Sequence, residues 1–209
     1  MLHPGCPRCS LPLTEAGDTW ACPEHGATPP LWRPQESTYD TFVKHLEHAS
    51  DFPTYLPWPM GPGWQVTDFG VVVQTGTRPR ATVSCVSGTS ALDGPVDVMV
   101  VSEEPGTGLG ARVARLDSPD PPDIGEGPPV VKVRIGPGPV SLWAVSTSDA
   151  DEEFDRFVMV GEAAGRWLWI VLRPASAMLL MRDEWILRDV AGIGAPLVEM
   201  SFGGPPPVW

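Results

Sequence analysis

Basic residues and histidines are scarce in this sequence. Its 209 residues include 14 Lys or Arg, 26 Asp or Glu and 4 His, and the net charge is −12. Because non-specific nucleic-acid binding depends on basic side chains that neutralise phosphates, this balance argues against a nucleic-acid partner. With so few histidines and no G-x-S-x-G motif, no catalytic constellation is recognisable and no catalytic residue is assigned.

Long hydrophobic runs are also missing. The longest, Trp167–Leu172 and Ala177–Met181, are far shorter than the ~20 residues of a membrane-spanning helix. The N-terminus shows no charged segment followed by an apolar one, which a signal peptide would need. We therefore expect a cytoplasmic protein with no membrane partner and with reduced cysteines.

Proline and glycine are abundant, with 26 and 22 residues. Such a share borders on the composition of disordered chains, but 42% of the residues are hydrophobic and nine are tryptophan. Disordered segments are poor in these residues, so the sequence predicts a folded, loop-rich protein.

Two paired-ligand motifs stand near the N-terminus. Cys6-Pro-Arg-Cys9 and Cys22-Pro-Glu-His25 are separated by twelve residues, which gives the spacing C-x2-C-x12-C-x2-H. This spacing predicts a zinc ribbon over residues 1–28, with short strands at 11–13 and 19–21. Four protein ligands fill a tetrahedral coordination sphere, so the expected cofactor is a structural zinc ion.

The alternative interpretation is a redox pair formed by Cys6 and Cys9. A redox C-x-x-C usually opens a helix beside a βαβ unit. Here Pro7 and Pro12 surround the motif and no apolar helix follows it. The sequence therefore favours the metal site, whose ligands would supply folding free energy to a segment too small to fold alone.

After the ribbon, we expect a Pro-rich linker at 29–35 and a β-rich α+β domain at 36–209 with a flexible Gly/Pro tail at 203–209. Residues 36–50 have the apolar spacing of one short amphipathic helix, with Ser37 as the N-cap. His45 and His48, three residues apart, could share a metal ion, but no third ligand is identifiable, so both are expected as solvated residues on the helix surface.

Short β-branched and aromatic runs then alternate with Gly/Pro clusters. This pattern predicts a mostly antiparallel β-sheet, and with one or two short helices the fold class is α+β. The segment 175–190 is compatible with a helix or with a strand, turn and strand. The candidate strands are 64–74, 80–86, 96–103, 129–135, 139–146, 156–162 and 166–173.

Tryptophans are spread through the main domain and are expected to fill its core, with an aromatic binding groove as the alternative. Trp209 has a third possibility, which is to dock on the domain itself or on a partner. The residues concerned are Trp58, Trp64, Trp143, Trp167, Trp169, Trp185 and Trp209.

A glycine-rich segment follows one of the candidate strands. Its glycines resemble a phosphate-cradling loop, although no lysine follows them and Glu103 and Glu104 would repel a phosphate. A tight connecting loop is the simpler interpretation, and a small anion or ligand site is the alternative. That site would consist of Gly106, Gly108, Gly110 and Arg112.

Several of these motifs together resemble an uncharacterised actinobacterial zinc-ribbon family of unknown function. They are Cys6-Pro-Arg-Cys9, Cys22-Pro-Glu-His25-Gly26, Pro29-Pro-Leu31, Leu56-Pro-Trp-Pro59, the segment from Glu103 to Arg112, and Trp167-Leu-Trp169. Members often carry the automatic name phosphotransacetylase. The resemblance implies a zinc site and an intracellular protein, and it leaves the function open.

These observations favour a non-enzymatic protein-interaction or adaptor module with an unidentified protein partner. The alternative is a small-molecule-binding domain, or an enzyme of acyl or phosphoryl chemistry, that uses the loop 106–110. A zinc-ribbon nucleic-acid adaptor is disfavoured by the charge. The sequence leaves the oligomeric state open.

Overall fold

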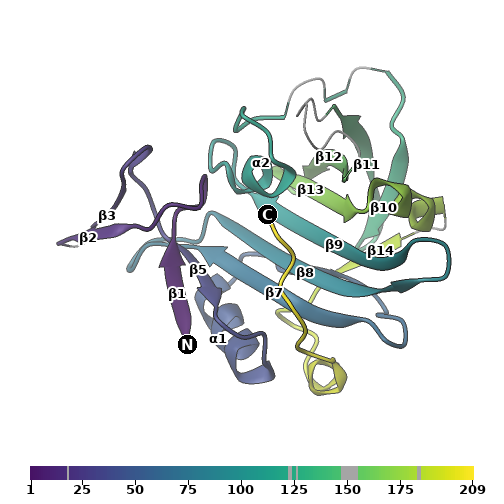
Figure 1. Cartoon of the computed structure of the whole chain (residues 1–209), viewed down its shortest axis with the longest axis horizontal. Coiled ribbons are helices and arrows are strands. Elements are labelled where there is room, and N and C mark those ends of the chain that lie inside the picture. The colour runs from purple at the N-terminus through teal and green to yellow at the C-terminus, as the bar shows by residue number, and fades with distance from the viewer. Residues whose placement is uncertain (18, 122–123, 126, 147–154, 183–184) are drawn as a thin grey trace.

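A computed structural model describes residues 1–17, 19–121, 124–125, 127–146, 155–182 and 185–209. These residues form one eleven-stranded sheet and a separate three-stranded sheet near the N-terminus (Figure 1). The large sheet has the order β1 (Leu2–Gly5), β5 (Leu31–Pro34), β7 (Gln65–Val72), β8 (Ala81–Ser90), β9 (Gly94–Glu103), β13 (Arg166–Arg173), β12 (Phe157–Ala163), β11 (Gly138–Val145), β10 (Val131–Ile135), β14 (Trp185–Asp189) and β6 (Tyr55–Pro57).

The predicted fold class is confirmed as a mostly antiparallel β-sheet with few short helices. Neighbours in the large sheet pair antiparallel, except that β10 and β14 are parallel. Each of the seven strands expected from the sequence is present, as β7 to β13. Their β-branched and aromatic runs, bounded by Gly/Pro clusters, were a good guide because strands buried on both faces are apolar along most of their length.

Alternate residues of the central strands enter two separate cores. Val96, Val98 and Val100 of β9 lie in one core with Phe42. Met99 of the same strand lies in the other core with Trp169. The sheet curls so that β6 contacts β8 and β9, and the hydroxyls of Thr82 and Ser84 donate to backbone carbonyls of Pro53 and Tyr55. Those bonds satisfy polar side chains that the curl buries.

The predicted helix begins later than expected, as α1 (Tyr39–Ala49). Its N-cap is Thr38, which forms a capping box with Thr41, so the expectation of Ser37 as the cap is wrong. Ser37 instead donates its hydroxyl to the carbonyl of Val66, 2.8 Å away. Thr38 caps the helix because the hydroxyl of Thr41, three residues later, accepts a hydrogen bond from the Thr38 amide.

His45 is fully buried, which corrects the expectation that it lies on the helix surface. It stands three residues after Phe42, on the same face of α1, and its Nε2 atom lies 3.0 Å from the Thr54 hydroxyl. Burial lowers the pKa of His45 to about 3, so the imidazole is neutral.

The other helical segments are α2 (Leu109–Ala114) and two 3₁₀ helices, η1 (Ala175–Arg182) and η2 (Ala195–Glu199). The ambiguous segment 175–190 is therefore a 3₁₀ helix followed by strand β14, with residues 183–184 outside the described ranges. Within the part of the chain that is described, no helix combines the length and apolarity needed to cross a membrane.

Residues 31–34, expected within a Pro-rich linker, are extended but form strand β5 of the large sheet. β5 pairs with β1 on one side and with β7 on the other. Its pairing with β7 is limited to Leu31 and Trp32, and Pro34, which has no N–H to donate, stands at the strand end. The segment 6–30 is thus an excursion between two neighbouring strands.

The tail 203–209, expected to be flexible, lies along the large sheet (Figure 1). Phe202 forms a bridge with Val66, and the amide of Gly203 donates to the Val66 carbonyl at 3.1 Å. Further along, the Arg173 guanidinium donates to the carbonyl of Val208. The tail thus contacts the sheet near both of its ends, and its flexibility stays a prediction.

Close backbone approach between β11 and β12 generates a first prediction. A Cβ at Gly161 would lie 2.2 Å from the carbonyl oxygen of Ser141, whereas a Cβ at Gly138 would meet nothing within 4 Å. Gly161→Ala should therefore lower the free energy of unfolding by about 1–3 kcal/mol, since backbone has to move. Gly138→Ala, on the neighbouring strand, is the control and should change it by less than about 0.5 kcal/mol. Equal denaturation midpoints for the two variants would contradict the close approach.

Candidate metal centre

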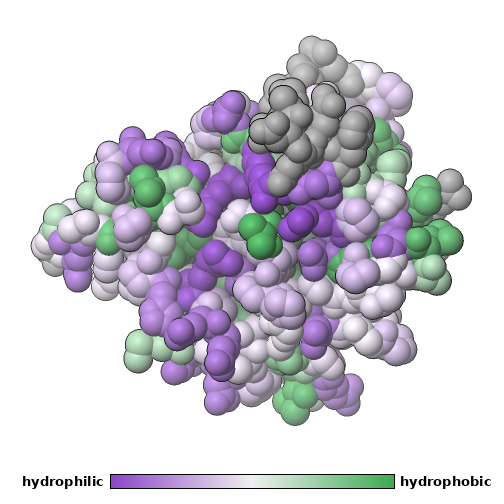
Figure 2. Space-filling model, in the orientation of Figure 1, coloured by the Kyte–Doolittle hydropathy of each residue, from purple (hydrophilic) through white to green (hydrophobic). Residues whose placement is uncertain are grey.

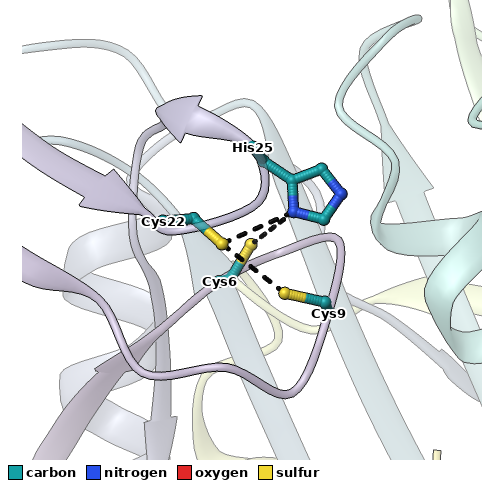
Figure 3. A group of neighbouring side chains, drawn as sticks. All are labelled: Cys6, Cys9, Cys22 and His25. Atoms are coloured by element: carbon teal, nitrogen blue, oxygen red, sulfur yellow. Dashed lines mark hydrogen bonds between the residues drawn. The ribbon is translucent and has the colours of Figure 1, made fainter.

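Three cysteines and one histidine converge at the N-terminal end of the molecule (Figure 3). Cys6 directly follows β1, Cys22 ends β3 (Thr19–Cys22), and His25 precedes β4 (Gly26–Ala27). The ligand atoms of Cys6, Cys9, Cys22 and His25 all lie within 4.8 Å of one another, and Figure 3 shows their side chains directed toward one centre. The structure thus brings together all four predicted ligands.

The ligand atoms are close both within the second turn, where Sγ of Cys22 lies 3.5 Å from Nδ1 of His25, and between the two turns. Sγ of Cys6 lies 3.7 Å from Nδ1 of His25, and Sγ of Cys9 lies 3.6 Å from Sγ of Cys22. A tetrahedral ion with bonds of ~2.3 Å to sulfur and ~2.1 Å to nitrogen would separate its ligands by about 3.6–3.8 Å. The cluster is therefore compatible with a tetrahedral metal site.

The hairpin that carries these ligands differs from the expected one. Its first strand is β2 (Thr14–Ala16), not residues 11–13, and it pairs with β3 in the small sheet. Pro12 has no N–H to donate to a neighbouring strand, so the hydrogen-bonded pairing begins only at Thr14, closer to the turn. Gly17, with φ of +64°, takes the left-handed conformation that this tight turn requires.

The thiols of the cluster differ in acidity. Burial acts to raise the pKa of Cys22, but hydrogen bonds with His25 and with the backbone amides of Glu24 and His25 outweigh it and lower the value to about 6. Burial raises the pKa of Cys9 to about 11. With this pKa the Cys22 side chain is a thiolate at neutral pH, and the thiolate is the form that binds metals.

The chain was compared with known proteins. A family model described as a family of unknown function (DUF6758) matches residues 1–208. The chain belongs to this family. Neither a curated protein nor a solved structure matches it. The match confirms that the chain belongs to a family of unknown function, as the motifs suggested. The description of the family includes neither the name phosphotransacetylase nor a source organism.

Arg8, between Cys6 and Cys9, connects the cluster to the loop before α2. Its guanidinium donates to the carbonyls of Thr107 at 3.1 Å and Gly106 at 2.5 Å. On the other side, Arg112 of α2 donates to the carbonyl of Cys6. Sequence reasoning missed Arg8, because a lone arginine between two ligands has no motif of its own.

The glycine-rich loop connects β9 to α2, and several of its polar groups have partners within the protein. Gly106 and Gly108 have φ of +77° and +83°, and a Cβ at Gly110 would lie 2.2 Å from Nε1 of Trp169. The loop carbonyls accept hydrogen bonds from Arg8, and Arg112 reaches toward Cys6. These contacts account for the glycines through turn geometry and close packing, and the ligand-binding role of the loop stays a prediction.

Glu103 is the buried acid beneath this loop. It is fully shielded from solvent, and one of its carboxylate oxygens accepts a hydrogen bond from the amide of Leu109 at 2.8 Å. Burial raises its pKa from 4.5 to about 7, against the lowering effect of backbone hydrogen bonds from Gly110 and Leu109. Sequence reasoning read Glu103 only as a repulsive surface charge, because its burial depends on strands that are distant in sequence.

The raised pKa of Glu103 gives a pH prediction. The folded state keeps a proton on Glu103 that the unfolded state loses, so its contribution to stability is full below about pH 4.5 and is lost as pH rises through about 7. Glu103→Gln removes this dependence. Its free energy of unfolding relative to wild type should rise by about 2–3 kcal/mol between pH 5 and pH 8.

Urea denaturation at both pH values measures the difference. The control is Glu104→Gln, a partly exposed neighbour paired with Arg80. A pH-independent difference between wild type and Glu103→Gln would show that Glu103 titrates normally.

Proposed function

We propose that the protein is a cytoplasmic zinc-binding protein whose metal is structural and whose role is protein interaction, not catalysis. The observation that carries the metal assignment is the cluster of three thiols and one imidazole. Zinc favours this donor set, and thiolate ligands are kept reduced in the cytoplasm. Four protein ligands leave no coordination position for a substrate.

A structural role suits the segment that holds the ligands. Every residue of β2 and of β4 is exposed, so the small sheet buries little apolar surface. A segment of this kind needs ligand–metal bonds to order it. Cys6 and Cys22 are buried, as is Pro7 beside Cys6, and ordering this turn places Arg8 against the loop at 106–107.

Zinc analysis tests this proposal. The purified protein should contain about one equivalent of zinc, since four ligands complete one tetrahedral site. Cys9→Ser should lower the content below half an equivalent, and chelation should lower the Tm of wild type more than that of Cys9→Ser. Cys85→Ala, at the buried free cysteine of β8, should retain the metal. Equal zinc content in Cys9→Ser and Cys85→Ala would exclude the cluster as the site.

The proposed interaction role is based on an aromatic groove beside β6 and β14. These strands are at the opposite end of the strand order from β1 and β5. Cavities of about 290 and 370 Å³ flank the loop 58–64. Both are lined by Trp58, Met60 and Trp64, and Trp185 closes the first. A Cβ at Gly88 would lie 2.4 Å from the Trp64 ring, so glycine there lets this indole lie flat on β8.

The partner chemistry that fits this groove is an extended, proline-containing peptide. The two cavities continue along one loop, which suits an elongated ligand, and proline rings stack well on tryptophan walls. Trp185 donates its indole N–H to the Leu180 carbonyl at 2.8 Å. Among the described residues, no hydrogen bond engages the indole N–H of Trp58 or Trp64, so both remain as donors for peptide carbonyls.

A peptide array tests the groove. Extended Pro-rich peptides should bind more tightly than alanine-substituted copies, because the polyproline II conformation is preformed and costs little entropy on binding. Trp58→Ala should weaken binding at least ten-fold, as measured by fluorescence anisotropy. Trp143→Ala, a partly exposed tryptophan on β11, should leave the affinity unchanged. Absence of binding to every Pro-rich peptide, or equal loss in the two variants, would refute this partner class.

The alternative of acyl or phosphoryl chemistry at the loop 106–110 has less support. A phosphate would need free backbone amides there. Two amides of this segment already have partners, since Leu109 donates to Glu103 and Thr107 donates to the carbonyl of Glu104.

A further inference from the structure

A cavity of about 460 Å³ lies where β1 and β5 meet α2, next to the metal centre. Its polar lining consists of His3, Ser10, Arg33, Gln35 and Arg112, and it contains no Asp or Glu. Two arginines without an acid in the lining are unusual in a chain of net charge −12. We refer to this space as the Arg33–Arg112 cavity.

The strand register places the cationic groups on one face of the sheet. His3 is directly opposite Arg33 in the β1–β5 pair, so both side chains leave the sheet on the same side. A Cβ at Gly70 would lie 2.9 Å from Cγ of Arg33. Glycine at this position of β7 therefore lets the Arg33 side chain pass over the strand to the carboxylate of Asp68.

Trp209 holds the two guanidinium groups near each other. The Arg33 guanidinium lies 3.9 Å from the centre of the indole ring, and that of Arg112 lies 4.8 Å away. Cation–π contacts of this kind fix the plane of a guanidinium. Figure 2 shows strongly hydrophilic residues gathered around the place where the chain ends in Figure 1.

The two guanidinium groups of the cavity have different partners. Asp68, which is 2% exposed, neutralises Arg33. The hydrogen bond of Arg112 goes to an uncharged carbonyl, that of Cys6, and the thiolates of Cys6 and Cys9 favour its charged form. A guanidinium has five N–H donors, so both groups retain donors for an anion in the cavity.

We propose that the Arg33–Arg112 cavity binds a small organic anion through a phosphate or carboxylate group. Its volume lies within the ~300–1,000 Å³ of small-molecule sites, and its lining combines a few polar donors with Leu31 and prolines. The site is distinct from the aromatic groove and from the loop 106–110. It gives the protein a ligand besides its metal and its peptide partner.

Calorimetric titration of the full chain tests the site. The probes are inorganic phosphate, glycerol 3-phosphate and succinate, each at constant ionic strength with sodium chloride. At least one should bind with a Kd of about 1 mM or lower, a modest affinity for a ligand with one anionic group. Arg112→Lys keeps the charge but loses the planar fork, and should weaken binding about three-fold or more.

Two variants add a negative charge to the cavity with little risk to folding. His3 and Gln35 are both exposed at its rim. His3→Glu and the isosteric Gln35→Glu should each weaken binding at least ten-fold by repulsion. The matched control is Leu92→Glu, which adds the same charge at a residue 79% exposed in the turn between β8 and β9. It should change the Kd by less than two-fold.

Two results would overturn the proposal. One is the absence of millimolar binding by all three anions. The other is an equal effect of Gln35→Glu and Leu92→Glu, which would show that only the net charge of the chain matters. Neither result bears on the peptide groove, whose test uses other residues.

Discussion

Strands β1 and β5 pair antiparallel, and the arrangement around the metal centre depends on that pairing. It returns the chain at Leu31 to the strand that it left at Gly5. The residues between them must therefore close on themselves, and the Cys6 and Cys22 turns face each other as a result. The same register places His3 beside Arg33. A single strand pair thus positions both the metal ligands and one wall of the Arg33–Arg112 cavity.

Helix α2 and the loop before it connect these features to the core. The Glu103 carboxylate accepts a hydrogen bond from the amide of Leu109, the first residue of the helix. Gly110 leaves room for the indole of Trp169. The Arg112 guanidinium donates to the carbonyl of Cys6. The loop carbonyls in turn accept hydrogen bonds from Arg8. Gly108 and Gly110 therefore allow close packing between the segment 6–30 and the sheet.

The two proposed binding surfaces lie near opposite ends of the strand order. The Arg33–Arg112 cavity is beside β1 and β5, and the aromatic groove is beside β14 and β6. Their chemistry differs as well, since one is cationic and the other is aromatic with free indole donors. The two proposals are therefore independent, because the cavities concerned share no lining residue.

Local patterns were sufficient for what depends on near neighbours in the sequence. The spacing of Cys6, Cys9, Cys22 and His25 identified the cluster, and β-branched and aromatic runs between Gly/Pro clusters indicated strands β7 to β13. The sequence could not show that His45 is buried, that Glu103 lies under α2, or that Trp209 stands between two arginines. Glu103 is close to α2 in the sequence, but its burial depends on pairing with Ala81 of β8 and Trp167 of β13. The other two features likewise depend on contacts between segments tens of residues or more apart, which exist only once the sheet has formed. The sequence by itself therefore determined which four residues are the candidate metal ligands. Only the tertiary structure decided the surroundings of His45, Glu103 and Trp209, and with them the charge and acidity of these sites. The physical reason is that burial and long-range pairing leave no local pattern in the sequence.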